Sequence, residues 1–180
     1  MLTLSKFRDR LQHSLFGLKR LTDYFTLGAI HSSASIDGID PSRVGIMAFS
    51  AGGELARMAL LSPPVAELGQ GDKVDSLSSR PDFGVLVYSG PLKGDIEAVT
   101  VNSPPVFMVA TNDDTCCSAP VIEILTAYNK AGASAEAHIY AEGGHAFNMG
   151  KRTKVENLAA WPKRLSEWMV QQGLQVKSSE

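Results

Sequence analysis

The chain has 180 residues, of which 44% are hydrophobic and 20% are charged, a composition typical of a globular protein with one sizeable core. Seventeen basic and nineteen acidic side chains give a formal charge of −2, which argues against bulk attraction to nucleic acid or to an anionic membrane. No segment is long and apolar enough to span a bilayer, and the charged N-terminus lacks the pattern of a signal peptide. We therefore expect no nucleic-acid or membrane partner and, by default, a cytoplasmic location, with secretion still open if a leader once preceded Met1.

The N-terminal segment, residues 1–30, predicts a helix, because leucine and phenylalanine recur there every three or four positions. A loop is predicted from Ser32 to Arg43, where Asp-Gly and Asp-Pro pairs are turn signals. We expect residues 1–180 to form a single domain, with this helical segment at its front.

From residue 44 onward, short apolar runs alternate with helical patterns. The predicted strands are Val44–Phe49, Phe83–Tyr88, Val106–Ala110 and Ala135–Tyr140, and the predicted helices are Gly52–Leu61, Ala119–Ala131 and a last one that begins near Pro162. Nearly continuous apolar strands separated by helices indicate an α/β fold, a parallel sheet with helices on both faces. Since ligands of such sheets bind beyond the carboxyl ends of the strands, functional groups are expected in the loops that follow them.

The loop after the first predicted strand carries Ser50, within Ala48-Phe-Ser-Ala-Gly-Gly53. A serine on a sharp strand-to-helix turn exposes its hydroxyl, and small neighbours let the strand and the helix approach closely. The N–H of Ala51, at the start of the helix, can point at a developing oxyanion. We interpret Ser50 as a candidate nucleophile and Ala51 as an oxyanion-hole donor; a glycine-rich helix start without chemistry is the alternative.

Two further strand ends carry polar groups that complement a serine. Thr111-Asn-Asp-Asp114 follows the third strand, and Glu142-Gly-Gly-His145 follows the fourth. A carboxylate can hold a histidine in the tautomer that accepts a proton from serine. An Asx-rich turn and a surface histidine are the alternatives. The order Ser…Asp…His, each after a strand, is nevertheless the order expected of α/β-hydrolases.

The two cysteines, Cys116 and Cys117, are adjacent. Adjacent residues rarely reach disulfide geometry, so we predict two free thiols, which suits a reducing compartment. Two neighbouring thiols do not form a zinc site without further ligands at suitable spacing. We therefore expect neither a metal nor an organic cofactor.

Four segments resemble bacterial acetyl-esterase and acetylxylan-esterase-like α/β-hydrolases. They are residues 39–53, 80–83, 103–105 and 135–147, within a resemblance that covers roughly residues 35–172. The resemblance implies a serine carboxylic-ester hydrolase that acts on short-chain, acetyl-type esters through an acyl-enzyme. It makes Ser50 the nucleophile and His145 the base. The aspartate falls on Asp114 when counted from Pro104-Pro105 and on Asp113 when counted from Ala131-Gly132, and we choose Asp114 because the strand is the more rigid ruler.

The sequence departs from these esterases at its front. They carry a His-Gly-Gly-Gly-like loop, a source of further oxyanion donors, well before the serine, and this sequence has no such motif. The early strands of the usual fold are therefore expected to be absent, which gives a shortened α/β-hydrolase fold. The strand Val44–Phe49 would then lie at a sheet edge and could pair with a second copy of the chain, which predicts a homodimer.

Three functions fit these observations. The first is hydrolysis of small-molecule esters. The second is a degenerate hydrolase that binds a ligand or partner without turnover, which the missing loop favours and the complete Ser-Asp-His set opposes. The third is a peptidase or acyltransferase that uses the same three residues.

Overall fold

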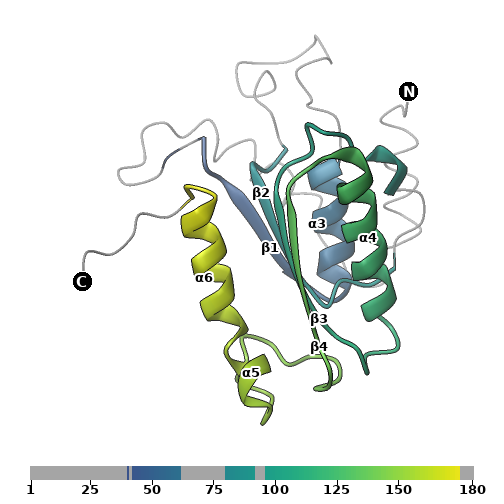
Figure 1. Cartoon of the computed structure of the whole chain (residues 1–180), viewed down its shortest axis with the longest axis vertical. Helices are drawn as coiled ribbons and strands as arrows, with labels where there is room; N and C mark the ends of the chain where they lie inside the picture. Colours follow the sequence, from purple (N-terminus) through teal and green to yellow (C-terminus); the bar gives the residue numbers. More distant parts are fainter. Residues whose placement is uncertain (1–39, 41, 62–79, 92–95, 175–180) are drawn as a thin grey trace, which may run out of the picture.

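The computed structural model describes residues 40, 42–61, 80–91 and 96–174 (Figure 1). The strands of this part form one parallel sheet in the order β1-β2-β3-β4. They are β1 (Gly45–Phe49), β2 (Phe83–Val87), β3 (Val106–Thr111) and β4 (Ala135–Tyr140). The predicted helix at residues 1–30 and most of the predicted loop from Ser32 to Arg43 lie outside the described residues.

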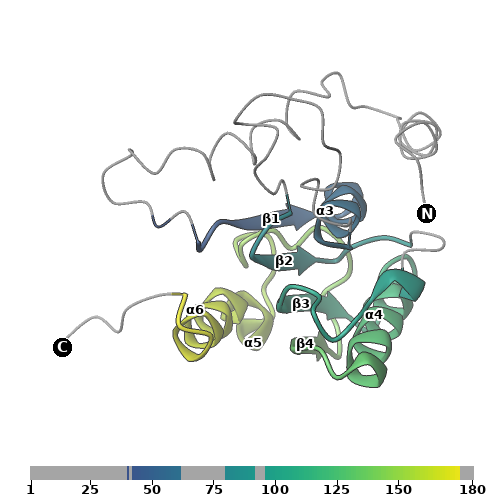
Figure 2. The same cartoon turned by 90° about the horizontal axis from the view of Figure 1, so that it is seen from above.

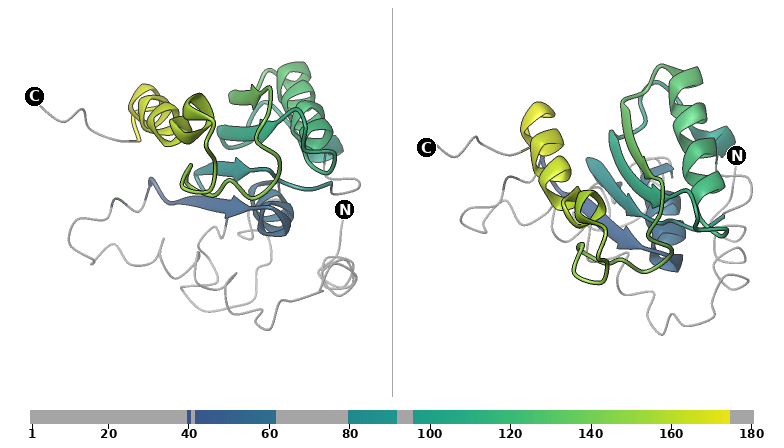
Figure 3. Two further views of the ribbon diagram at one scale, coloured as in Figure 1. Left: turned by 90° about the horizontal axis from the view of Figure 1, so that it is seen from below. Right: turned by 60° about the horizontal axis from the view of Figure 1, so that its bottom comes forward.

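Helices cover both faces of the sheet. Helices α3 (Ala51–Leu61) and α4 (Ser118–Ala131) lie on one face, and α6 (Trp161–Gln171), preceded by the short α5 (Glu156–Ala159), lies on the other (Figure 2). The two views of Figure 3 show the same separation of α6 from α3 and α4 by the strands. A short 3-10 helix, η2 (Ile96–Ala98), precedes β3. This arrangement confirms the predicted α/β fold with helices on both faces.

The apolar strands are explained by burial on two sides. Every residue of β3 is buried, and so are four of the five residues of β2. On the α6 side, the buried cluster includes Val85, Val87, Phe107, Val109, Trp161, Leu165 and Trp168. On the α3 and α4 side, it includes Ala56, Leu60, Leu86, Val106, Met108, Ala110, Val121, Ile124 and Tyr128. Alternating residues of β2 and β3 therefore face different helices, which is why neither strand shows a polar face.

The ends of several elements follow from backbone conformation. Strand β2 ends one residue earlier than predicted, because Tyr88 has a φ of 40°. Helix α4 ends at Ala131, where Gly132 adopts the left-handed conformation that favours glycine. Pro162 lies in the first turn of α6, where the missing N–H has no cost to helical hydrogen bonding.

None of the helices in the described ranges has the length and apolar character needed to cross a bilayer.

Strand β1 lies at one edge of the described sheet. Its residues are half-buried, apart from Met47, which is 40% exposed, whereas β2 and β3 in the centre are almost fully buried. The edge position agrees with what the sequence predicts for this strand. Pairing of this edge with a second copy of the chain stays a prediction.

Candidate active site

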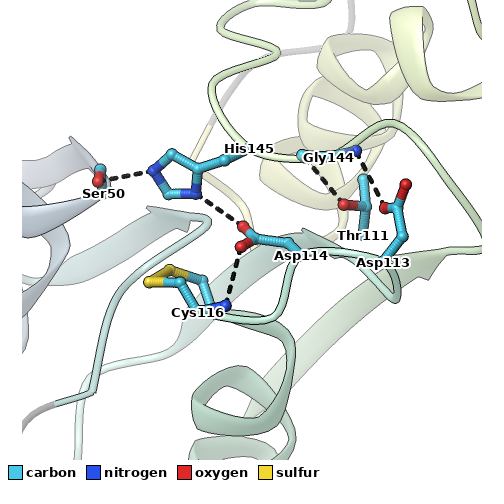
Figure 4. Close-up of polar contacts among 8 residues, drawn as sticks. Ser50, Thr111, Asp113, Asp114, Cys116, Gly144 and His145 are labelled. Atoms are coloured by element: carbon cyan, nitrogen blue, oxygen red, sulfur yellow. Dashed lines mark hydrogen bonds and ion pairs between the residues drawn. A yellow bond between two sulfur atoms is a disulfide. The ribbon is translucent and has the colours of Figure 1, made fainter.

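Three polar side chains predicted from the sequence meet beyond the carboxyl ends of the strands. Ser50 Oγ lies 2.8 Å from His145 Nε2, and His145 Nδ1 lies 2.7 Å from Asp114 Oδ2 (Figure 4). They are brought together from the loops after β1, β3 and β4. In the tautomer with a proton on Nδ1, the imidazole donates to Asp114 and Nε2 accepts from the Ser50 hydroxyl.

Backbone hydrogen bonds join the turn that carries Ser50 to strand β2 and to helix α3. The N–H of Ser50 donates to the carbonyl of Val87 on β2 (3.0 Å), and the Ser50 carbonyl accepts from the N–H of Gly53 in α3 (2.8 Å). Ser50 has a φ of 51°, a left-handed conformation that costs a non-glycine residue about 1–2 kcal/mol. The fixed, strained turn projects the hydroxyl toward His145 instead of into the helix.

The small residues around Ser50 have different roles. A Cβ added at Gly52 would lie 3.7 Å from the Cβ of Ala48, which is an ordinary contact distance. The side chain of Ala48 therefore fits at a position where related motifs often have glycine. A Cβ added at Gly53 would lie only 3.0 Å from the backbone of Ser89, so Gly53 is the position that lets α3 pack against the end of β2.

Ala51 is the first residue of α3. The first N–H groups of a helix have no acceptor within the helix, and the helix dipole makes that end electropositive. The Ala51 N–H is thus available to an oxyanion that forms next to Ser50. The front of the chain, where related esterases carry their further donors, lies outside the described residues.

Asp114 is the aspartate that faces His145. Its side chain is only 3% exposed, and its second oxygen, Oδ1, accepts a hydrogen bond from the N–H of Cys116 at 3.1 Å. Both carboxylate oxygens are therefore engaged, which fixes the orientation of the group that His145 meets.

Asp113, the other aspartate allowed by the sequence, lies against the histidine loop instead of the ring. Its carboxylate accepts from the N–H groups of Gly144 (3.0 Å) and Gly143 (3.1 Å). These two hydrogen bonds, with a further one from Thr111, lower the pKa of Asp113 below its usual value. The one proton of the Thr111 hydroxyl is shared between this carboxylate and the Gly144 carbonyl, whose oxygen lies 2.9 Å from Thr111 Oγ1. The two aspartates thus make different contacts, and that difference follows from how the two loops fit together.

Tyr88 is a site residue that the sequence motifs do not reveal. Its ring lies 4.6 Å from the ring of His145 and 4.7 Å from that of Phe147, measured between centroids. The side chain is almost completely buried, and this burial raises the pKa of its hydroxyl. Tyr88 therefore forms an apolar support beneath His145. Its position directly after β2, at a strand end, is the signal that could have singled it out.

The prediction of free thiols is wrong, because the structure joins Cys116 and Cys117 in a disulfide. The reason is the tight turn that leads into α4, in which the N–H groups of both Cys117 and Ser118 donate to the carbonyl of Asp114. This turn brings the side chains of two adjacent residues to the same side, which the general rarity of such pairs does not anticipate. The pair lies beside Asp114, at the edge of the site (Figure 4).

The histidine loop requires glycine at Gly143 more strictly than at Gly144. A Cβ at Gly143 would collide with Leu158, which is fully buried, and φ there is 139°. At Gly144, where φ is 63°, a Cβ would meet nothing within 4 Å. We expect Gly144→Ala to lower the free energy of unfolding by about 1–2 kcal/mol, and Gly143→Ala to lower it by more, about 2–4 kcal/mol, from strain and overpacking together. Urea unfolding of the two variants measures both values, and equal losses would contradict this description of the loop.

Comparison with known proteins assigns the sequence to a family. The model of the dienelactone hydrolase family matches residues 14–171. The chain belongs to the dienelactone hydrolase family. This family is part of the α/β-hydrolase superfamily, so the resemblance found in the sequence is confirmed at that level. No curated protein sequence matches the chain.

Solved structures with the same fold include several ester hydrolases. An acetyl ester-xyloside bifunctional hydrolase from Caldicellulosiruptor lactoaceticus has a TM-score of 0.76 and 24% identity, over 86% of this chain and 66% of that one. A carboxylesterase from Lactobacillus plantarum has a TM-score of 0.70 and 19% identity, over 85% and 67%. A butyrate-bound esterase from Thermogutta terrifontis has a TM-score of 0.69 and 17% identity, over 87% and 66%. This member of the dienelactone hydrolase family thus spans about two thirds of the length of these structures and shares their fold.

Proposed function

We propose that the chain is a serine carboxylic-ester hydrolase that works through an acyl-enzyme. The observation that carries the proposal is the continuous hydrogen-bonded series from Ser50 through His145 to Asp114, with distances of 2.8 and 2.7 Å. Membership of a hydrolase family and the esterases among the structural neighbours support it.

In the first half-reaction, Ser50 Oγ attacks the ester carbonyl while its proton passes to His145 Nε2. Asp114 holds the ring by Nδ1 and stabilises the imidazolium. The carbonyl oxygen becomes an oxyanion, which accepts a hydrogen bond from Ala51 N–H. As the oxyanion collapses, the bond to the alcohol breaks, and the alcohol leaves with the proton from Nε2. The product is an acyl ester of Ser50.

In the second half-reaction, a water molecule replaces the alcohol. His145 Nε2 takes a proton from this water as the oxygen attacks the acyl carbonyl, and returns it to Ser50 Oγ when the carboxylic acid departs. The cycle begins and ends with the same protonation states. Each step uses the described side chains, the substrate and water, and none calls for a metal or an organic cofactor.

Short acyl groups are the substrate class we propose. His145 is 37% exposed, so the reacting groups are open to a small-molecule ester from solution. The names and contents of the neighbours point the same way, since one is an acetyl ester hydrolase and another was solved with butyrate bound.

Hydrolysis of aryl esters of increasing acyl length tests the proposal. We expect the chain to hydrolyse p-nitrophenyl acetate and butyrate well above the uncatalysed rate, and to lose activity with the octanoate ester. Release of p-nitrophenolate gives the rate for each ester. Rates at background for all three esters would contradict hydrolase activity, and a preference for octanoate would contradict the substrate class.

A second candidate is a degenerate hydrolase, which binds ligands without turnover because its oxyanion hole lacks donors. Loss of one oxyanion donor typically lowers the rate by about 10²–10³-fold. A protein of this kind would bind an ester and release it unchanged. Formation of a covalent adduct on Ser50 separates the two candidates.

A further inference from the structure

The side chains of Cys116 and Cys117 have no role in the proposed mechanism, although they lie beside Asp114 and His145. Donor atoms of both cysteines, of Asp114 and of His145 all lie within 4.8 Å of one another. The backbone N–H of Cys116 also donates a hydrogen bond to Asp114 Oδ1. The residues that would orient and move the proton are therefore also members of a cluster of possible metal ligands.

This cluster has the composition of a zinc site. Thiolate, imidazole and carboxylate are the protein ligands of Zn²⁺, which prefers four of them in a tetrahedron. With bond lengths of about 2.0–2.3 Å, the donor atoms of such a tetrahedron lie about 3.3–3.8 Å apart. The most distant donor atoms would approach each other by about 1–1.5 Å. Asp114 Oδ2 and His145 Nδ1, now 2.7 Å apart, would instead separate by about 0.6 Å or more. Cys116 and His145 are both exposed side chains that have room to move.

The oxidation state of the cysteines decides whether the site exists. In the disulfide, the two sulfurs are bonded to each other and offer no thiolate. A dithiol reductant supplies two electrons and two protons, which breaks the S–S bond and leaves two thiols while the reductant becomes a disulfide. Because Cys116 is exposed, a reductant can reach the bond from solvent. A divalent cation then displaces one proton from each thiol as it binds.

We propose that reduction of the Cys116–Cys117 disulfide creates a site for Zn²⁺ formed by the two cysteines with Asp114 and His145. His145 Nδ1 faces Asp114 and is the ring nitrogen on the side of this cluster. Metal on Nδ1 leaves the ring proton on Nε2, so the ring no longer accepts the proton of Ser50. Zinc is thus an inhibitor of the reduced protein, and the oxidised protein is insensitive to it. Binding stands by itself, whereas inhibition rests on the proposed function.

Cobalt serves as the probe of binding, because Co²⁺ bound by thiolates gives a charge-transfer absorption that does not depend on catalysis. The protein is reduced with a dithiol, freed of the reductant by desalting under argon, and titrated with Co²⁺ and then with Zn²⁺. Three further samples are titrated in the same way: the oxidised protein, Cys116→Ser, and Thr115→Ala as a matched control from the same loop. Cys116→Ser removes one exposed ligand without opening a cavity, and circular dichroism verifies its fold.

The proposal predicts a thiolate-to-cobalt band that saturates near one metal ion per chain in the reduced wild type and in Thr115→Ala. The band disappears on addition of Zn²⁺ and is absent from the oxidised protein. It is lost or strongly weakened in Cys116→Ser. Absence of the band in the reduced wild type, or an equal band in Cys116→Ser, would overturn the site and leave the cysteines as a bond that only closes the turn.

Ester hydrolysis on the same samples tests inhibition separately. Because the metal removes the general base, we expect Zn²⁺ to lower the rate of the reduced wild type by about 100-fold or more, with recovery on addition of EDTA. For the oxidised protein and for Cys116→Ser, we expect the same rate with Zn²⁺ as without it. A cobalt band in a protein without esterase activity would contradict the proposed function and support the metal site. Turnover by a reduced protein that shows no band would do the reverse.

Discussion

Replacing Ser50 with alanine is expected to lower kcat/KM for p-nitrophenyl acetate by about 10⁶-fold, because the variant has no oxygen that can form the acyl-enzyme. The side chain is small and only half-buried, so the variant should unfold at nearly the same temperature as the wild type. Initial rates over a range of substrate concentrations, with a melting curve for each protein, measure both quantities.

Ser89→Ala is the matched control for this substitution. Ser89 follows the next strand of the sheet, is fully buried, and its hydroxyl has no hydrogen-bond partner among the described residues. Its loss should leave kcat/KM within about twofold of the wild type, since no hydrogen bond is broken. An equal loss of activity in the two variants would show that the effect of Ser50→Ala does not come from the nucleophile.

Asn in place of Asp114 is expected to lower kcat by about 10⁴-fold, because an amide oriented toward Nδ1 favours the wrong tautomer of His145. The same change at Asp113 should lower kcat by about tenfold or less, since Asp113 contacts the loop backbone and an amide oxygen can still accept one of its two hydrogen bonds. The ratio of the two effects is the decisive quantity. A larger loss in Asp113→Asn than in Asp114→Asn would exchange the roles of the two aspartates.

Acid should remove the contribution of Asp113 to stability. Its pKa is lowered in the folded protein, so the ionised carboxylate stabilises the fold at pH values above 3.8, its ordinary value, and this stabilisation disappears as the pH falls through the lowered pKa. Wild type should therefore melt at a higher temperature than Asp113→Asn at neutral pH, and the two melting temperatures should converge below pH 3.8. A constant difference down to acid pH would contradict a role for the charge.

The strands and the three polar residues could be predicted because their signals are local. A strand buried on two sides needs an uninterrupted apolar run, as in Val106–Ala110, and parallel strands bring their carboxyl ends to one edge. Ser50 follows β1 directly, and Asp114 and His145 lie within five residues of the ends of β3 and β4, so the topology alone places the three at one edge of the sheet. The sequence distinguishes Asp113 from Asp114 less clearly, because counting from different ends of the segment gives different residues.

The remaining features depend on how loops fit together. The support beneath His145 arises because Tyr88 leaves the strand with a positive φ, which nothing in its own residue type requires. The tie between Asp113 and the histidine loop joins residues about thirty positions apart. Sequence spacing could not show the cluster around the cysteines, since His145 comes from a different strand end than Cys116 and Cys117. The rule on adjacent cysteines failed for a related reason, because it ignores the turn on which they lie.

The most direct test of the account is covalent labelling with a fluorophosphonate, followed by mapping of the modified peptide by mass spectrometry. The hydrogen-bonded series Ser50–His145–Asp114 predicts a single adduct per chain, located on Ser50, that forms faster than in Asp114→Asn and is absent from Ser50→Ala. An adduct on another residue, or no adduct on a protein that melts like a folded one, would contradict the assignment of Ser50 as the nucleophile.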